Sequence, residues 1–279
     1  MARILVVGCG DIGYRVAQAL HELGHDVTGL KKHSPARSAP FPIMVADIQQ
    51  TSALALLPTD FQQVLFIVSA GSRQADAYQM LYQNGLHNLL SHFASSGHSP
   101  SWLMVSSTSV YGQNQAEWVD ENSETKPISP SSQYLLAAEK CLLQLDAKHC
   151  VVRFSGIYGP GRDWLLRRAA SGESIQQQPP SYTNRIHQDD CVGVLVFLMQ
   201  KQLANEVLEP CYIASDNEPV PLWDVMHWIA HQYGLPEPNA LIMPADAPQN
   251  KRCSNAKLVA LGYQFLFPSY RDGYLKPTE

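Results

Sequence analysis

The chain contains 279 residues, of which 45% are hydrophobic and 16% are charged, and its formal net charge is -5. This length is sufficient for a large α/β domain, alone or with a smaller lobe. The acidic balance, with no run of Lys or Arg longer than a pair, argues against a general nucleic-acid binder. No apolar run approaches the roughly 18 residues of a membrane span, so no membrane partner is expected.

The first two-thirds of the chain alternate short apolar runs with helical patterns. Strands are predicted at residues 4–7, 26–30, 42–45, 64–68, 102–105 and 151–154. Helices are predicted from the first turn to Gly24, from Met80 to near Gly97, and over 135–145. Short apolar strands separated by helices typically form a parallel sheet covered on both faces. We therefore predict an α/β fold with a doubly wound parallel sheet.

Beyond about residue 160 the sequence changes character. Prolines at 179, 180, 219, 221, 236, 238, 244 and 248 separate short elements. We predict a first domain over residues 1–160 and a smaller C-terminal α/β lobe over 161–279. Within the lobe, the chain could return to the sheet around residues 183–215.

The turn Gly8-x-Gly10-x-x-Gly13 lies between the first predicted strand and the first predicted helix. In such a turn the first glycine permits the tight bend, the second lets the backbone approach a pyrophosphate, and the third lets the helix pack on the strand. Asp11 and Ile12 complete the turn, where the helix N-terminus favours anions. The motif predicts a dinucleotide-binding Rossmann domain. The alternative is a Rossmann fold that has lost its ligand.

The residues after the second strand bear on the choice of dinucleotide. About 20 residues after the turn, NAD binders typically carry an acid that holds the ribose 2′-hydroxyl. Lys31 and Lys32 stand there instead, and Arg37 could add to them. Ammonium groups attract a 2′-phosphate, so we predict NADP, with NAD as the second choice. The alternative interpretation is a solvated basic loop.

Cofactor contacts are also predicted after the next two strands. Asp47 and Ile48 follow the third strand, and Asp47 is placed to meet the adenine unless it is only a surface turn residue. Ser69 directly follows the fourth strand and joins the predicted cofactor set.

Five later segments together carry a family pattern. They are residues 105–112 (VSSTSVYG), 119–121 (VDE), 153–161 (RFSGIYGPG), 185–190 (RIHQDD) and 261–263 (LGY). In order and spacing they resemble the extended short-chain dehydrogenase/reductase family, the NAD-dependent epimerase/dehydratases. The resemblance implies a nicotinamide cofactor on the Rossmann domain. It also implies that the lobe over 161–279 holds a small substrate, such as a nucleotide sugar.

The chemistry of this family rests on a Tyr-x-x-x-Lys pair on one helix face. The lysine lowers the pKa of the tyrosine, which can then act as a general base. Pro130 and the Ala138-Glu139 pair align with the family pattern and put Ser131 and Leu135 at the tyrosine and lysine positions. The usual pair is therefore missing, as in the atypical subgroup of the family.

Two residues are the remaining catalytic candidates. Ser107 aligns with the catalytic serine or threonine of the family; the alternative is a strand-end serine that bonds the backbone. Tyr134 could be a displaced acid/base, with packing as the alternative. Ala138 stands where its lysine should be, and Lys140 lies about 240° around the helix from Tyr134.

Two functions remain open from the sequence. One is an NAD(P)-dependent epimerase/dehydratase or reductase that acts on a nucleotide-sugar-like or other small carbonyl/alcohol substrate. The other is a noncatalytic NAD(P)-binding sensor or scaffold. Long helices on the sheet could build a homodimer. The scattered cysteines and the lack of a recognisable secretory leader predict a cytoplasmic protein with reduced thiols and no metal site.

Overall fold

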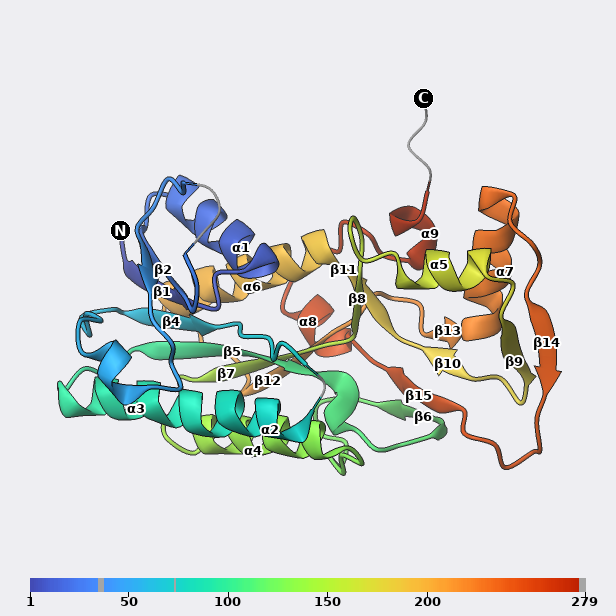
Figure 1. The fold of residues 1–279 in the computed structure, drawn as a ribbon, viewed down its shortest axis with the longest axis horizontal. Helices are drawn as coiled ribbons and strands as arrows, with labels where there is room; N and C mark the ends of the chain where they lie inside the picture. The colour runs from blue at the N-terminus through green and yellow to red at the C-terminus, as the bar shows by residue number, and fades with distance from the viewer. Residues whose placement is uncertain (35–37, 73, 276–279) are drawn as a thin grey trace. The chain divides into compact units, whose positions relative to one another are not determined.

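The computed structural model describes residues 1–34, 38–72 and 74–275 (Figure 1). Arg37 lies outside the described residues. By its internal contacts the chain divides into two compact units. The first comprises Met1–Val110, Pro127–Arg153 and Val192–Tyr212; the second comprises Tyr111–Lys126, Phe154–Cys191 and the chain from Ile213 onward.

The central feature is a seven-stranded sheet in the order β12-β7-β5-β4-β1-β2-β3. Its strands are β1 (Arg3–Val7), β2 (Asp26–Lys31), β3 (Ile43–Val45), β4 (Gln63–Phe66), β5 (Ser101–Ser107), β7 (Cys150–Phe154) and β12 (Cys211–Ala214). The pairings of β1 with β2 and β4, of β2 with β3, and of β4 with β5 are parallel. This arrangement confirms the predicted doubly wound α/β fold.

Helices cover both faces of this sheet (Figure 1). Helices α1 (Asp11–Glu22) and α6 (Gln188–Leu203) lie on one face, and α2 (Ala75–Tyr78), α3 (Leu86–Ser95) and α4 (Pro130–Leu143) lie on the other. All four residues of β4 are buried, as are the last four of β1. Coverage on both faces explains why these strands are continuous apolar runs instead of alternating patterns.

The helix predicted from Met80 begins earlier and is not uniform. It runs from α2 through a π-helical segment, η2 (Gln79–Gly85), into α3. The rings of Tyr78 and Tyr82 stack here with centroids 5.5 Å apart. At Gly85 a Cβ would lie 2.9 Å from the side chain of Ile48, so the glycine allows this close approach. The short 3-10 turns η1 (Thr51–Leu54) and η3 (Thr108–Val110) connect other elements of this unit.

The second unit is built from short strand pairs and helices. Its strands are β6 (Gln115–Val119), β8 (Gly156–Tyr158), β9 (Ser174–Gln178), β10 (Tyr182–Thr183), β11 (Arg185–His187), β13 (Val220–Pro221), β14 (Asn239–Ile242) and β15 (Asn250–Cys253). Its helices are α5 (Trp164–Ala170), α7 (Leu222–Tyr233), α8 (Ala256–Ala260) and α9 (Tyr270–Gly273). An apolar cluster that includes Leu165, Ile175, Val225 and Ile229 forms its core.

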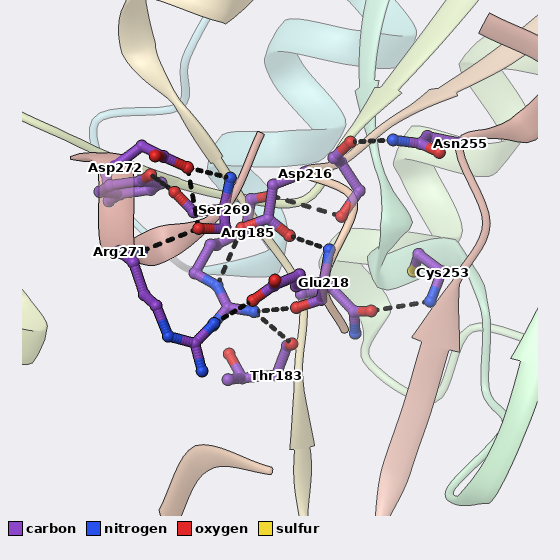
Figure 2. A network of polar contacts seen from close by, with 12 residues as sticks. Thr183, Arg185, Asp216, Glu218, Cys253, Asn255, Ser269, Arg271 and Asp272 are labelled. Carbon is purple, nitrogen blue, oxygen red and sulfur yellow. Dashed lines mark hydrogen bonds and ion pairs between the residues drawn. The ribbon is translucent and has the colours of Figure 1, made fainter. Parts of the chain in front are cut away.

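A buried ion pair belongs to the polar network of the second unit (Figure 2). The Nε of Arg185 lies 3.3 Å from Oδ2 of Asp216, and both side chains are nearly inaccessible. Arg185 Nη2 also donates to the carbonyls of Thr183, at 3.2 Å, and Glu218, at 2.5 Å. The Arg185 guanidinium lies over the ring of Tyr270, 5.0 Å from its centroid. A buried cation needs such compensation, because its loss of hydration costs several kcal/mol.

The burial of Asp216 predicts a pH dependence of stability. Burial raises the pKa of Asp216 from 3.8 to about 7, although the Arg185 guanidinium acts to lower it. Between these pH values the folded state holds a proton that the unfolded state has lost. The contribution of Asp216 to stability is therefore present at low pH and is lost as the pH rises through about 7.

We expect Asp216→Asn to remove this contribution to the slope of stability against pH. The measurement is the melting temperature of the wild type and of the variant across the same pH range. Asp224→Asn, at an exposed position of α7, is the control and should keep the wild-type slope. Parallel profiles for wild type and Asp216→Asn would contradict the expectation.

Candidate functional site

The glycine turn joins β1 to α1 and is tightly packed at Gly8 and Gly13. Gly8 has a φ of +94°, and a Cβ on it would lie 2.1 Å from the carbonyl oxygen of Ile67. A Cβ on Gly13 would lie 2.3 Å from the oxygen of Gly8. A Cβ on Gly10 would lie 3.9 Å from its nearest neighbour, the oxygen of Gly8, so the packing of the protein does not itself require a glycine there. The open space at Gly10 fits a group that approaches the backbone closely, as a pyrophosphate does.

The turn continues into α1, which begins at Asp11. Asp11 is exposed, whereas Ile12, also in the first turn of α1, is buried. The backbone N–H of Tyr14 donates to the oxygen of Gly10 at 2.8 Å, so the first helical turn starts at the second glycine. The positive end of α1 therefore lies at the turn, where it favours an anion.

Cys9 lies on the inner side of the turn and is 1% exposed. Its Sγ would be 2.8 Å from a Cβ on Gly29, which explains a glycine within β2. Burial raises the pKa of the Cys9 thiol to about 11, although Lys31 acts to lower it. The thiol is thus protonated near neutral pH and fills space under the turn instead of acting as a nucleophile.

A cavity of about 670 Å³ lies in the first unit, beside the glycine turn. Its described lining comes from the ends of parallel strands and from one helical segment. These residues are Val7, Gly8, Leu30, Lys31, Lys32, His33, Ala46, Asp47, Ile48, Gln49, Val68, Ser69, Ala70, Gly71, Ser72, Asp76, Ala77, Met80 and Leu81. In open α/β sheets ligands bind at this edge, outside the carboxyl ends of the strands. The volume is in the range of small-molecule sites.

The cavity brings together residues predicted separately from the sequence. They are Gly8, Lys31, Lys32, Asp47, Ile48 and Ser69. Gly10, Asp11, Ile12 and Gly13 follow Gly8 in the turn but are outside the described lining. The wall formed by residues 70–72 and by α2 and η2 was not predicted from the sequence. The signal was Gly71 shortly after a strand end, since loops at the carboxyl edge of a sheet often carry binding residues.

Opposite charges meet at this cavity. Lys32 Nζ lies 3.0 Å from Oδ2 of Asp47. Oδ1 of Asp47 accepts the backbone N–H of Gln49 at 3.0 Å. Burial acts to raise the pKa of Asp47, but the Gln49 N–H and the Lys32 ammonium outweigh it and hold this pKa below the usual value. Asp47 is therefore a carboxylate at neutral pH.

The orientation of α4 is set by a second buried ion pair. Glu139 is 1% exposed, and its Oε2 accepts Arg153 Nη2 at 2.7 Å. Ser106 of β5 also donates to Glu139. These contacts tie one face of α4 to β5 and β7. Leu135, which the sequence pattern aligns with the family lysine, is buried.

Serine hydroxyls occupy the region between the start of α4 and the end of β5. Ser129 caps α4, since its Oγ accepts the N–H of Ser132 at 3.2 Å. The Ser129 hydroxyl donates to Ser132 Oγ at 2.8 Å, and the Ser132 hydroxyl donates to Ser109 Oγ at 2.9 Å. The Oγ atoms of Ser129 and Ser131, the latter aligned by the sequence pattern with the family tyrosine, lie 3.1 Å apart. This hydroxyl chain was not predicted from the sequence.

The two catalytic candidates lie in different surroundings. Ser107 is at the end of β5, and its Oγ accepts the backbone N–H of Ser109 at 3.1 Å. Tyr134 lines another cavity, of about 660 Å³, together with Tyr82, Cys141 and residues of α3. Ser107 lines neither this cavity nor the one beside the glycine turn.

Two further kinds of feature are absent from residues 1–34, 38–72 and 74–275. None of their helices is both long enough and apolar enough to span a membrane. Within the same ranges, no cluster of three or more His, Cys, Asp or Glu side chains is arranged to hold a metal ion.

The sheet order, the glycine turn and the adjoining cavity define a Rossmann-like nucleotide-binding architecture. Residues 4–209 match the model of the NAD dependent epimerase/dehydratase family, and the chain belongs to this family. This confirms the resemblance drawn from the sequence motifs.

Individual proteins extend the match over the whole chain. The chain is 24% identical to Protein YeeZ of Escherichia coli K12, over 100% of both chains. A solved structure from Methylobacillus flagellatus, described provisionally as an NAD-dependent epimerase/dehydratase, is 36% identical with a TM-score of 0.83, covering 98% and 96% of the two chains. The dTDP-glucose 4,6-dehydratase of Bacillus anthracis, solved in complex with NAD, shares the fold at 16% identity and a TM-score of 0.76, covering 98% and 94%.

The glycine turn predicts that folding and binding can be separated by mutation. Gly10→Ala should change the free energy of unfolding by less than about 1 kcal/mol, because the new Cβ meets no atom within 3.9 Å. It should still weaken dinucleotide binding at least about tenfold by blocking the backbone approach. Gly13→Ala is the matched variant and should lower stability clearly more, because its Cβ would clash with Gly8.

Chemical denaturation and calorimetric titration with NAD⁺ and NADP⁺ measure the two effects. The prediction would be contradicted if Gly10→Ala bound the dinucleotide as tightly as the wild type, or if Gly10→Ala and Gly13→Ala lost the same amount of stability.

Proposed function

We propose that this protein is an NADP-dependent enzyme of the epimerase/dehydratase type, which moves a hydride to or from a nucleotide sugar or a similar small carbonyl/alcohol substrate. The observation that carries the proposal is the open backbone at Gly10, close to a cavity lined by Lys31 and Lys32. NAD is the alternative cofactor, and the Bacillus anthracis relative was solved with NAD.

The residues beside the turn fit a dinucleotide. We assign the pyrophosphate to the backbone of Gly8 to Gly13 at the N-terminus of α1. Asp47, Ile48 and Ser69 would contact the adenosine half, and the two lysines would hold its 2′-phosphate. When bound, the nicotinamide supplies or accepts the hydride. A nucleotide sugar is the favoured substrate class because a relative with the same fold is a dTDP-glucose dehydratase.

If the cofactor is NADP, the ratio of NADPH affinity to NADH affinity should depend on the charge at residue 31. Wild-type protein should bind NADPH more tightly than NADH, and Lys31→Asp should reduce the ratio of the two affinities by about tenfold or more, because a carboxylate repels the 2′-phosphate. Fluorescence titration of both reduced and both oxidised nucleotides measures this ratio. Equal affinities in the wild type, unchanged by Lys31→Asp, would refute the NADP assignment.

Catalysis is proposed to depend on Ser107, which would orient the reacting oxygen from the end of β5. The role of Tyr134 as a displaced acid/base stays a prediction, and its place in the other cavity argues against it. A noncatalytic NAD(P)-binding sensor or scaffold is the second candidate function. It is favoured by one observation: hydroxyls and the buried Leu135 stand where the family carries its tyrosine and lysine.

A screen for hydride exchange between labelled NADPH or NADP⁺ and nucleotide sugars tests these roles. We expect turnover that falls by about a hundredfold or more in Ser107→Ala, the low end for loss of a catalytic acid/base or oxyanion donor. Tyr134→Phe should keep the wild-type turnover. Loss in Tyr134→Phe would instead support the displaced tyrosine. No turnover by wild-type protein that binds the cofactor would favour the noncatalytic function.

A further inference from the structure

The cavity beside the glycine turn contains a carboxylate as well as the lysines. Asp47 lies 3.0 Å from Lys32, whereas a 2′-phosphate on the ligand would need the same ammonium group. An ammonium held by a fixed carboxylate is less available to an incoming phosphate, and the carboxylate also repels it. A stronger Lys32–Asp47 pair would therefore weaken binding of a 2′-phosphate relative to a 2′-hydroxyl.

The two partners of this pair differ in exposure and in anchoring. The Asp47 side chain is 17% exposed, whereas that of Lys32 is 54% exposed. Asp47 is anchored within its own turn, because its Oδ1 accepts the N–H of Gln49 and its carbonyl accepts the N–H of Gln50, each at 3.0 Å. The carbonyl of the adjoining Ile48 accepts Asn88 Nδ2 at 2.9 Å. Lys32 has a long, half-exposed side chain, so it is the partner that can move to a phosphate.

We propose that Asp47 sets the cofactor preference of this protein by competing with the 2′-phosphate of NADP for Lys32. The competition lowers the advantage of NADP over NAD, because NAD has a neutral 2′-hydroxyl and leaves the Lys32–Asp47 pair intact. Asp47 is thus a specificity-determining residue, and its effect is opposite to that of the lysines. The inference rests on the proposed binding of a nicotinamide dinucleotide in this cavity.

The test compares four variants with the wild type by calorimetric titration of NADP⁺ and NAD⁺. Asp47→Asn keeps an oxygen for the Gln49 N–H but removes the charge, and should raise the NADP⁺ to NAD⁺ affinity ratio by at least about threefold. Asp76→Asn is the matched control, since it removes a carboxylate from the same cavity wall without touching the pair. It should change the ratio by less than half as much. Lys32→Ala and the double variant Lys32→Ala/Asp47→Asn complete a double-mutant cycle. In the Lys32→Ala background, Asp47→Asn should change the NADP⁺ to NAD⁺ affinity ratio less than it does in the wild type.

Three outcomes would overturn the inference. They are an unchanged or lower ratio in Asp47→Asn, an equal rise in Asp76→Asn, and an undiminished effect in the Lys32→Ala background. Melting temperatures of each variant show whether it is folded. A wild type that prefers NAD⁺ would defeat the proposed NADP dependence alone, if Asp47→Asn still shifts the ratio toward NADP⁺. Binding of neither nucleotide by folded wild-type protein would defeat both proposals.

Discussion

The close packing of the β1–α1 turn is the constraint on which the candidate site depends. Gly8 faces the backbone of Ile67 after β4, and Gly13 faces the oxygen of Gly8, at distances that no side chain tolerates. The N–H groups of Gly8 and Cys9 donate to the oxygen of Leu30 at 3.0 and 3.2 Å, which holds the end of β2 against the turn. The ends of three strands therefore meet at one point. Lys31 is the last residue of β2 and Lys32 follows it, so both lie beside the turn.

A different buried contact governs the region where chemistry is proposed. The Glu139 carboxylate joins α4 to Arg153 and Ser106, and so fixes which residues of the helix are directed toward the sheet. Removal of a charged partner from such a buried pair typically costs several kcal/mol, so this register is firmly held. The sequence pattern aligns Ser131 and Leu135 of this helix with the family pair, and hydroxyls of Ser129, Ser132 and Ser109 are linked at its start.

The charges of the first cavity are also balanced by tertiary contacts. A pair of lysines at the end of β2 suggests a strongly positive site when the sequence is considered alone. In the folded chain Lys32 meets Asp47, which its own turn holds ionised. The positive field available to an anion is therefore smaller than a count of lysines suggests. The pair is only partly buried, so its strength depends on solvent and on ligand and is not fixed by the fold.

Local sequence determined the strand–turn–helix unit at the N-terminus, because glycine spacing and apolar periodicity act over a few residues. It also determined the order of strands and helices in the first unit and the family, since each motif is a short contiguous segment. Contacts distant in the chain had to come from the tertiary structure. These include the pairing of Lys32 with Asp47, the cavity wall from α2 and η2, and the different surroundings of Tyr134 and Ser107. The physical reason is that the local sequence pattern predicts which helix or strand a residue belongs to and which face of it the side chain occupies. The residue that the side chain contacts depends on which other elements pack against that face.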